Sequence, residues 1–189
     1  MVDSSKQMPP SLVKESIDFI TSKWGQITPS MSIICGSGWG VIVQAFPSTR
    51  SLNYSEIPGI GDTTIKGHAG KLILADFDSI QVLIFQGRRH LYEGVGWDPI
   101  RFPILLSYEL NAKTILLTNA AGGISTDFKV GDIMVLDDHI NFMNGNPLQG
   151  PVVHPDMPRF PDQTKIYDPE HIDEILKIGT YHELSLIHI

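Results

Sequence analysis

The fold of this chain is decided by the stretch Ile80-Gln81-Val82-Leu83-Ile84-Phe85-Gln86-Gly87-Arg88-Arg89-His90-Leu91-Tyr92-Glu93-Gly94. Its first part, residues 80–85, has the length and apolar composition of a buried β-strand. The polar residues follow directly, so they emerge at the carboxyl end of a strand, where open α/β sheets place their binding sites. The stretch therefore predicts an α/β fold with a site at this edge of the sheet.

The polar part of the stretch combines three kinds of side chain between Gly87 and Gly94. The guanidinium fork of Arg88 matches a phosphate, and the imidazole of His90 adds a second donor. The ring of Tyr92 offers an amphipathic face to a sugar. This combination suggests a pocket that holds an oxyanion beside a polyol. The alternative is a solvated basic loop, and the stretch alone does not decide between the two.

Composition limits the classes of partner. The chain has 189 residues, of which 42% are hydrophobic and 19% charged, as expected for one globular domain. Its net charge of −7 argues against nucleic acid or an anionic membrane as a partner, because both attract basic surfaces. No window has the length of a membrane span, and the N-terminus is polar. The single cysteine, Cys35, fits a small core residue better than a reactive thiol, and we expect a cytoplasmic protein.

The spacing of apolar residues predicts alternating helices and strands. Helices are expected at 11–24, at 98 to about 110 with Pro99 in the first turn, and from Asp168-Pro169 to a stop at Gly179. Strands are expected at 31–35, 71–76, 79–85, 113–117 and 131–136, the second and third forming a hairpin through Phe77-Asp78. Residues 143–162 form an irregular stretch too long for a connector, so it is functional or disordered.

Three further segments are rich in small residues. Gly36-Ser37-Gly38-Trp39-Gly40 joins a strand to the apolar run 41–46, expected to be helical, which is a weak phosphate-cradle pattern without the Rossmann spacing or a P-loop lysine. Gly67-His68-Ala69-Gly70 places a histidine between glycines, and taken alone it favours an ordinary loop over a binding segment. Thr118-Asn119-Ala120-Ala121-Gly122-Gly123 follows a strand and makes backbone N–H donors accessible, although a plain turn is the alternative.

Taken together and in this order, the four segments resemble the trimeric purine nucleoside phosphorylases. The resemblance implies a phosphorylase-like three-layer α/β sandwich, with a mixed central sheet flanked by helices. It also implies a pentosyltransferase that splits purine (6-oxopurine) ribonucleosides and deoxyribonucleosides with phosphate, in purine salvage. The products would be the free base and ribose 1-phosphate or deoxyribose 1-phosphate. Inorganic phosphate is then a co-substrate, and neither a cofactor nor a metal is needed.

The resemblance implies a role for each matching residue. Ser37, His68, Arg88 and His90 would bind phosphate, together with the backbone N–H of Ala120. Arg88 and His90 would also be the catalytic residues.

The remaining roles concern the nucleoside. Tyr92 would lie against the ribose, and Phe160 would reach the ribose of a neighbouring subunit in a homotrimer. Ala121 and Gly122 would line the base, while Asn119 would support the phosphate loop.

The resemblance extends to Tyr181. We therefore expect residues 1–181 to be the N-terminal part of a purine nucleoside phosphorylase domain, without the family's later purine-binding residues and several strands. Residues 182–189 do not resemble the family, and the last six match a translated sequencing adapter, so we expect an artefactual tail. A genuine divergent or spliced tail is the alternative.

Two other functions stay open. A catalytically silent, truncated fragment could bind phosphate or associate with full-length subunits, because the base site would be missing. A nucleoside-binding structural protein is supported only by acidic charge and loop composition.

Overall fold

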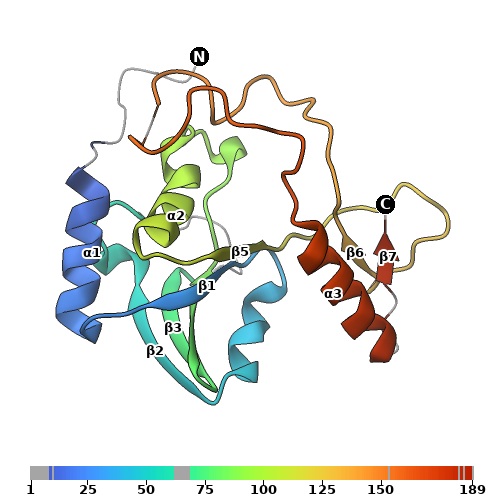
Figure 1. Cartoon of the computed structure of the whole chain (residues 1–189), viewed down its shortest axis with the longest axis horizontal. Helices are drawn as coiled ribbons and strands as arrows, with labels where there is room; N and C mark the ends of the chain where they lie inside the picture. Colours follow the sequence, from blue (N-terminus) through green and yellow to red (C-terminus); the bar gives the residue numbers. More distant parts are fainter. Residues whose placement is uncertain are drawn as a thin grey trace. The chain divides into compact units, whose positions relative to one another are not determined.

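The computed structural model describes residues 9, 11–61, 69–152, 154–182, 184 and 186–188 (Figure 1). The chain forms two units, Met1–Ala120 and Ala121–Ile189. His68 lies outside the described residues, while the other predicted phosphate ligands all belong to the first unit.

A mixed sheet of five strands forms the centre of the first unit, in the order β2-β3-β4-β1-β5. The strands are β1 (Pro29–Ile34), β2 (Ser48–Asn53), β3 (Lys71–Phe77), β4 (Ile80–Gln86) and β5 (Thr114–Leu117). Strand β3 is antiparallel to both β2 and β4, whereas β1 is parallel to both β4 and β5. The predicted α/β fold with a mixed sheet is confirmed. The carboxyl ends of β4, β1 and β5 therefore meet at one edge.

The predicted hairpin is present as β3 and β4, but its turn is shifted by one residue. Phe77 pairs with Ile80, so Asp78 and Ser79 form the turn, and Asp78 adopts a positive φ of 50°. A short polar residue tolerates this left-handed conformation well. The outer strand β2 was not predicted.

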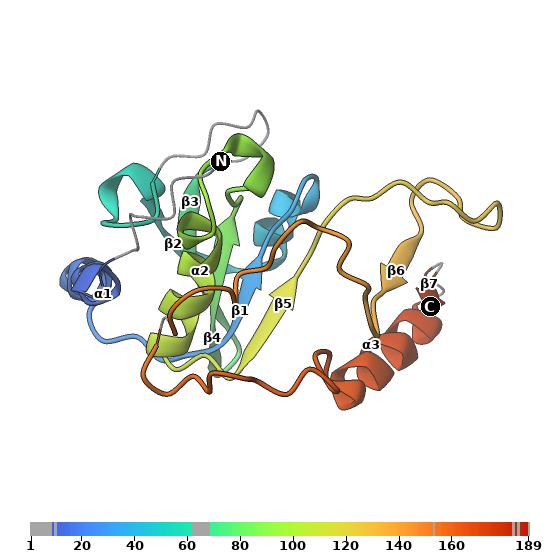
Figure 2. The ribbon, with the colours of Figure 1, turned by 90° about the horizontal axis from the view of Figure 1, so that it is seen from above.

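Two helices cover one face of the sheet (Figure 2). Helix α1 (Ser11–Trp24) buries Val13, Ser16 and Ile20, which share one helical face, and Gly25 ends it with a φ of 77°. Helix α2 (Asp98–Glu109) buries Phe102 and Leu106 on the same core. Both helices thus lie where the apolar spacing predicts them.

The opposite face of the sheet packs against the segment Trp39–Ala45, which forms the 3-10 helix η1 rather than an α-helix. Gly40 and the β-branched run from Val41 to Val43 lower α-helix propensity, which favours a tighter turn. Ile33, Cys35 and Ile84 are buried on this face. The sheet therefore lies between α1 and α2 on one face and η1 on the other.

The second unit contains β6 (Ile133–Val135), α3 (Pro169–Tyr181) and β7 (Leu186–His188). The Asp168 carboxylate accepts hydrogen bonds from the N–H groups of Glu170 and His171, as an N-cap does. The predicted stop at Gly179 was wrong, because the helix continues to Tyr181 with Gly179 buried inside it. Strand β7 pairs in parallel with β6, and the domain boundary at 181 stays a prediction. In the described part of the chain, each helix is too short or too polar to cross a bilayer.

Candidate active site

Three of the four predicted segments lie at one edge of the sheet. Ser37 follows β1, Arg88 follows β4, and Asn119 and Ala120 follow β5, and these three strands are hydrogen-bonded neighbours. The carboxyl edge of parallel strands is the usual place for a ligand in an open α/β sheet. Arg88 is half-buried there, whereas Ser37, Asn119 and Ala120 are exposed.

The turn after β1 lies directly against the turn after β5. The backbone N–H of Gly36 donates a 3.0 Å hydrogen bond to the Thr118 hydroxyl, which is itself 3.5 Å from the Ile34 carbonyl. A Cβ built on Gly36 would lie 2.8 Å from the Asn119 Cα and closer still to the Thr118 carbonyl oxygen. Only glycine fits at position 36, so the small residue there allows the Ser37 and Asn119 turns to meet.

Arg88 joins the same contact from β4. Its Nη1 donates a 2.9 Å hydrogen bond to the Thr118 carbonyl, so Thr118 holds both neighbouring segments. Burial lowers the pKa of Arg88, while nearby Cys35 and Tyr92 act in the opposite direction. An arginine remains charged at neutral pH even so. The edge therefore carries a fixed positive charge beside a turn of small residues.

Cys35 is the residue before this turn, and it is 1% exposed. Burial raises the pKa of its thiol, and the positive charge of Arg88 opposes this in part. A buried, protonated thiol reacts poorly, so Cys35 fits the predicted role of a core residue.

Glu93 orders the residues between Arg88 and Gly94. One of its carboxylate oxygens accepts from the His90 backbone N–H at 2.5 Å, and the other lies 2.8 Å from Arg89 Nε. The His90 and Tyr92 rings stack with centroids 5.0 Å apart. Tyr92 remains 77% exposed, which leaves its ring available to a ligand. The loop is thus fixed from inside by Glu93 and presents His90 and Tyr92 together.

The described end of the fourth segment also lies at this edge. Gly70 donates its N–H to the Gln86 carbonyl at 3.1 Å, and its own carbonyl accepts from the Tyr54 N–H at 2.8 Å. Gln86 is the last residue of β4, two positions before Arg88. His68 itself is outside the described residues, so its predicted role stays a prediction.

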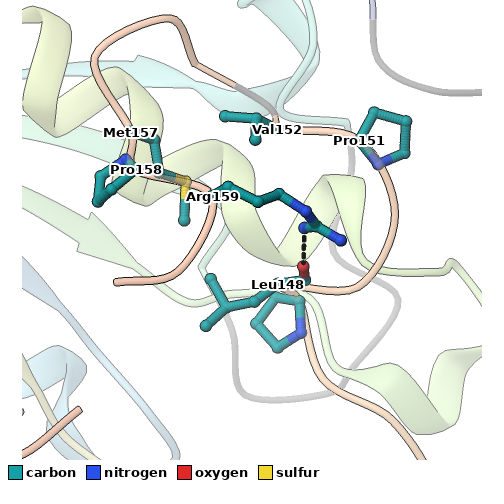
Figure 3. Close-up of a pocket in the computed structure, with 7 residues that line it drawn as sticks. Leu148, Pro151, Val152, Met157, Pro158 and Arg159 are labelled. Carbon is teal, nitrogen blue, oxygen red and sulfur yellow. Dashed lines mark hydrogen bonds between the residues drawn. The ribbon is translucent and has the colours of Figure 1, made fainter. Parts of the chain in front are cut away.

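The second unit holds the other predicted residues. Ala121 and Gly122 are exposed, and Phe160 is 86% exposed. Beside Phe160, Arg159 Nη1 donates to the Leu148 carbonyl at 3.3 Å, across a pocket lined largely by prolines and apolar side chains (Figure 3). This bond joins two residues 11 positions apart within the irregular stretch.

Sequence reasoning assigned no role to three residues that hold the edge together. All three lie within the quoted segments, but only the structure shows what the side chains of Thr118 and Glu93 contact. The third, Gln86, donates from Nε2 to the Gly40 carbonyl at 2.9 Å and so ties η1 to β4. A polar side chain at the last position of a buried strand was the signal that could have found Gln86.

Comparison with known proteins points to one family. The family model of the phosphorylase superfamily matches residues 31–186. The chain is 40% identical over 141 residues to purine nucleoside phosphorylase 1 of Bacillus subtilis, covering 75% of this chain and 52% of that protein. It is 39% identical over 155 residues to purine nucleoside phosphorylase of Bos taurus, covering 78% and 54%.

A solved structure shares the fold. Isoform 2 of purine nucleoside phosphorylase from Schistosoma mansoni, in complex with cytosine and ribose-1-phosphate, superposes with a TM-score of 0.85 at 32% identity, covering 94% of this chain and 64% of that one. The chain spans about half the length of the curated relatives it matches. The resemblance predicted from the four segments is confirmed, and the chain belongs to the phosphorylase superfamily.

Proposed function

We propose that this chain is the phosphate- and ribose-binding part of a purine nucleoside phosphorylase. The observation that carries the proposal is the joint contact of Gly36, Arg88 and Thr118 at the carboxyl edge of the parallel strands. It places a cation beside a glycine turn, as a bound oxyanion requires. The similarity to purine nucleoside phosphorylases over three quarters of the chain supports the same activity.

The proposed reaction transfers a ribosyl group from a purine to phosphate. A phosphate oxygen forms a bond to C1′ on the face opposite the base, and the C1′–N bond breaks with its electron pair leaving on the purine, which takes up a proton from the solvent. The transition state resembles an oxocarbenium ion, so an anion held beneath C1′ stabilises it. Positioning contributes much of the rate, on the order of 7–11 kcal/mol.

Phosphate would be held by groups from each strand end. In this proposal Arg88 gives a bidentate contact, Ser37 and His90 add side-chain donors, and the Ala120 N–H contributes from the backbone. His68 completes the set by resemblance. The proposed charge balance needs no metal or cofactor, because the nucleophile is already an anion.

The nucleoside would lie over the phosphate. We assign Tyr92 to the ribose because its exposed ring stacks on His90. Ala121 and Gly122 are assigned to the base and Asn119 to the support of the loop. The solved Schistosoma mansoni relative was crystallised with ribose-1-phosphate, the sugar product of such a reaction.

The direct test is to incubate the purified chain with inosine and phosphate and to measure hypoxanthine and ribose 1-phosphate by chromatography. Formation of both products, dependent on phosphate, is the expected result. Release of hypoxanthine without phosphate would indicate a hydrolase and overturn the proposal.

The span of about half the relatives' length favours a second candidate. A silent fragment would bind orthophosphate without turning over inosine, or would associate with full-length subunits. Calorimetric titration of the chain with orthophosphate distinguishes this fragment from an active enzyme when it is read beside the turnover assay.

We further propose a cytoplasmic homotrimer that serves purine salvage. A single cysteine, which cannot form an internal disulfide, is typical of a reducing compartment. Phe160 is 86% exposed and lies 5.6 Å, by its ring centroid, from the Arg159 guanidinium carbon. An apolar ring that is this exposed in its own chain is suited to packing against a neighbouring subunit.

Replacing Phe160 by alanine is expected to weaken nucleoside binding at the active site of the adjacent subunit, not at its own. Mixing Phe160→Ala subunits with Arg88→Ala subunits should then give more activity than the sum of the two separate variants, because a site that keeps its own Arg88 can receive Phe160 from an Arg88→Ala neighbour. Activity equal to that sum would show that Phe160 does not cross between subunits. Sedimentation velocity gives the oligomer mass independently.

A further inference from the structure

Gly87 connects strand β4 to Arg88, and both polar groups of its backbone are fixed. Its φ of 111° is a conformation that other residues rarely adopt. Its N–H donates to the Phe85 carbonyl at 3.0 Å, and its carbonyl accepts a 2.7 Å hydrogen bond from the Tyr54 hydroxyl. Because a glycine has no side chain to restrict it, the Tyr54 bond is what sets the orientation of the peptide plane that leads into Arg88.

Tyr54 is held firmly enough to do this. Its side chain is 2% exposed in the core formed by the sheet, α1 and α2. Tyr54 is the first residue of the 3-10 turn Tyr54–Glu56. The exposed Glu56 carboxylate stabilises this turn by accepting a 2.9 Å hydrogen bond from the Asn53 N–H. Its own N–H donates to the Gly70 carbonyl at 2.8 Å. One residue thus contacts both Gly70 and Gly87, the ends of two predicted phosphate-binding segments.

The chemistry of the phenol suits a permanent donor. Burial raises the pKa of Tyr54 well above its ordinary value, and nearby Cys35 raises it further. The hydroxyl therefore stays protonated throughout the range in which the protein would work. Gly87 is buried, so its carbonyl has no ready replacement for this bond.

We propose that Tyr54, which lies outside all four predicted segments, is a positioning residue that aims Arg88 at phosphate by fixing the Gly87 peptide. The inference rests on the proposed function. It assigns Tyr54 no contact with substrate. Its effect is transmitted through the backbone from the Gly87 carbonyl to the Arg88 side chain, which is anchored at its far end on Thr118.

The test is Tyr54→Phe in the 189-residue chain, titrated with orthophosphate by calorimetry. We expect affinity for phosphate to fall about 3- to 10-fold, the loss that one neutral hydrogen bond allows. The Gly87 carbonyl carbon resonance should move upfield on losing its donor, a change that general loosening of the core does not predict. Tyr181→Phe, on an exposed tyrosine of α3, is the control and should leave both measurements unchanged.

A second variant guards against failure of Tyr54→Phe to fold. Glu56→Ala removes the exposed hydrogen bond between the Glu56 carboxylate and the Asn53 N–H without changing the core. It should weaken phosphate binding about twofold. Wild-type affinity in the folded Tyr54→Phe variant overturns the inference, as does wild-type affinity in Glu56→Ala if Tyr54→Phe does not fold. If the wild-type chain itself binds no orthophosphate, the proposed phosphate site fails and the inference fails with it.

Discussion

Arg88→Ala is expected to weaken phosphate binding about 10- to 150-fold, the effect of losing charge-assisted hydrogen bonds worth roughly 1.5–3 kcal/mol. The guanidinium is half-buried at the carboxyl edge of the sheet, where its orientation is set by the bond to the Thr118 carbonyl. Calorimetric titration with orthophosphate measures the loss directly, and the phosphate KM measures it wherever turnover is seen.

Two control variants separate charge from geometry. Arg88→Lys keeps the charge but not the planar fork, so it should recover only part of the affinity. Arg50→Ala removes an arginine from β2, where it bonds the Trp24 carbonyl, and should leave phosphate binding unchanged. An Arg88→Ala variant that binds phosphate as tightly as the wild type would remove Arg88 from the site.

Gly36→Ala is expected to destabilise the first unit by about 3 kcal/mol, at the upper end of what overpacking usually costs. The added methyl group would press on the Thr118 carbonyl and on the Asn119 Cα, 2.8 Å away. Both are backbone atoms, so they cannot turn aside as a flexible side chain can. Urea unfolding followed by circular dichroism measures the change.

The same substitution should also abolish phosphate binding in whatever fraction remains folded, because the turns carrying Ser37 and Asn119 would separate. Gly122→Ala, in the second unit, is the control for the unfolding measurement alone, since a methyl group there meets nothing within 4 Å. Its free energy of unfolding should stay near the wild-type value. Equal stability of Gly36→Ala and Gly122→Ala would contradict the close approach of the two turns.

The main elements of the fold could be predicted because their signals are local. The apolar run before Gln86, the Pro99 helix start and the spacing in 11–24 each depend on neighbouring residues, and each element is present. Strand β2 was missed because Ser48–Asn53 is mostly polar, and it becomes a strand by pairing with β3. Strand β2 thus depends on tertiary pairing, which a local sequence pattern does not reveal.

The site shows the same division. The segments of the candidate site could be proposed from residue types, because arginine and histidine have distinctive side-chain chemistry and glycine has distinctive backbone freedom. The residues that join the segments were missed, because the roles of Thr118 and Tyr54 depend on partners 30 or more positions away. No sequence pattern marks a tyrosine as the donor to one particular glycine carbonyl.

The bond between Gly36 and Thr118 joins residues 82 positions apart. Contacts of such sequence separation are slow to form, since the chain entropy of the closed loop is lost before the contact is gained. We therefore expect the edge, which is the proposed phosphate site, to be completed late, after the local hairpin of β3 and β4. A ligand that binds groups brought together after the folding transition state lowers the unfolding rate and leaves the folding rate nearly unchanged. Phosphate should therefore prolong the lifetime of the folded chain without speeding its formation.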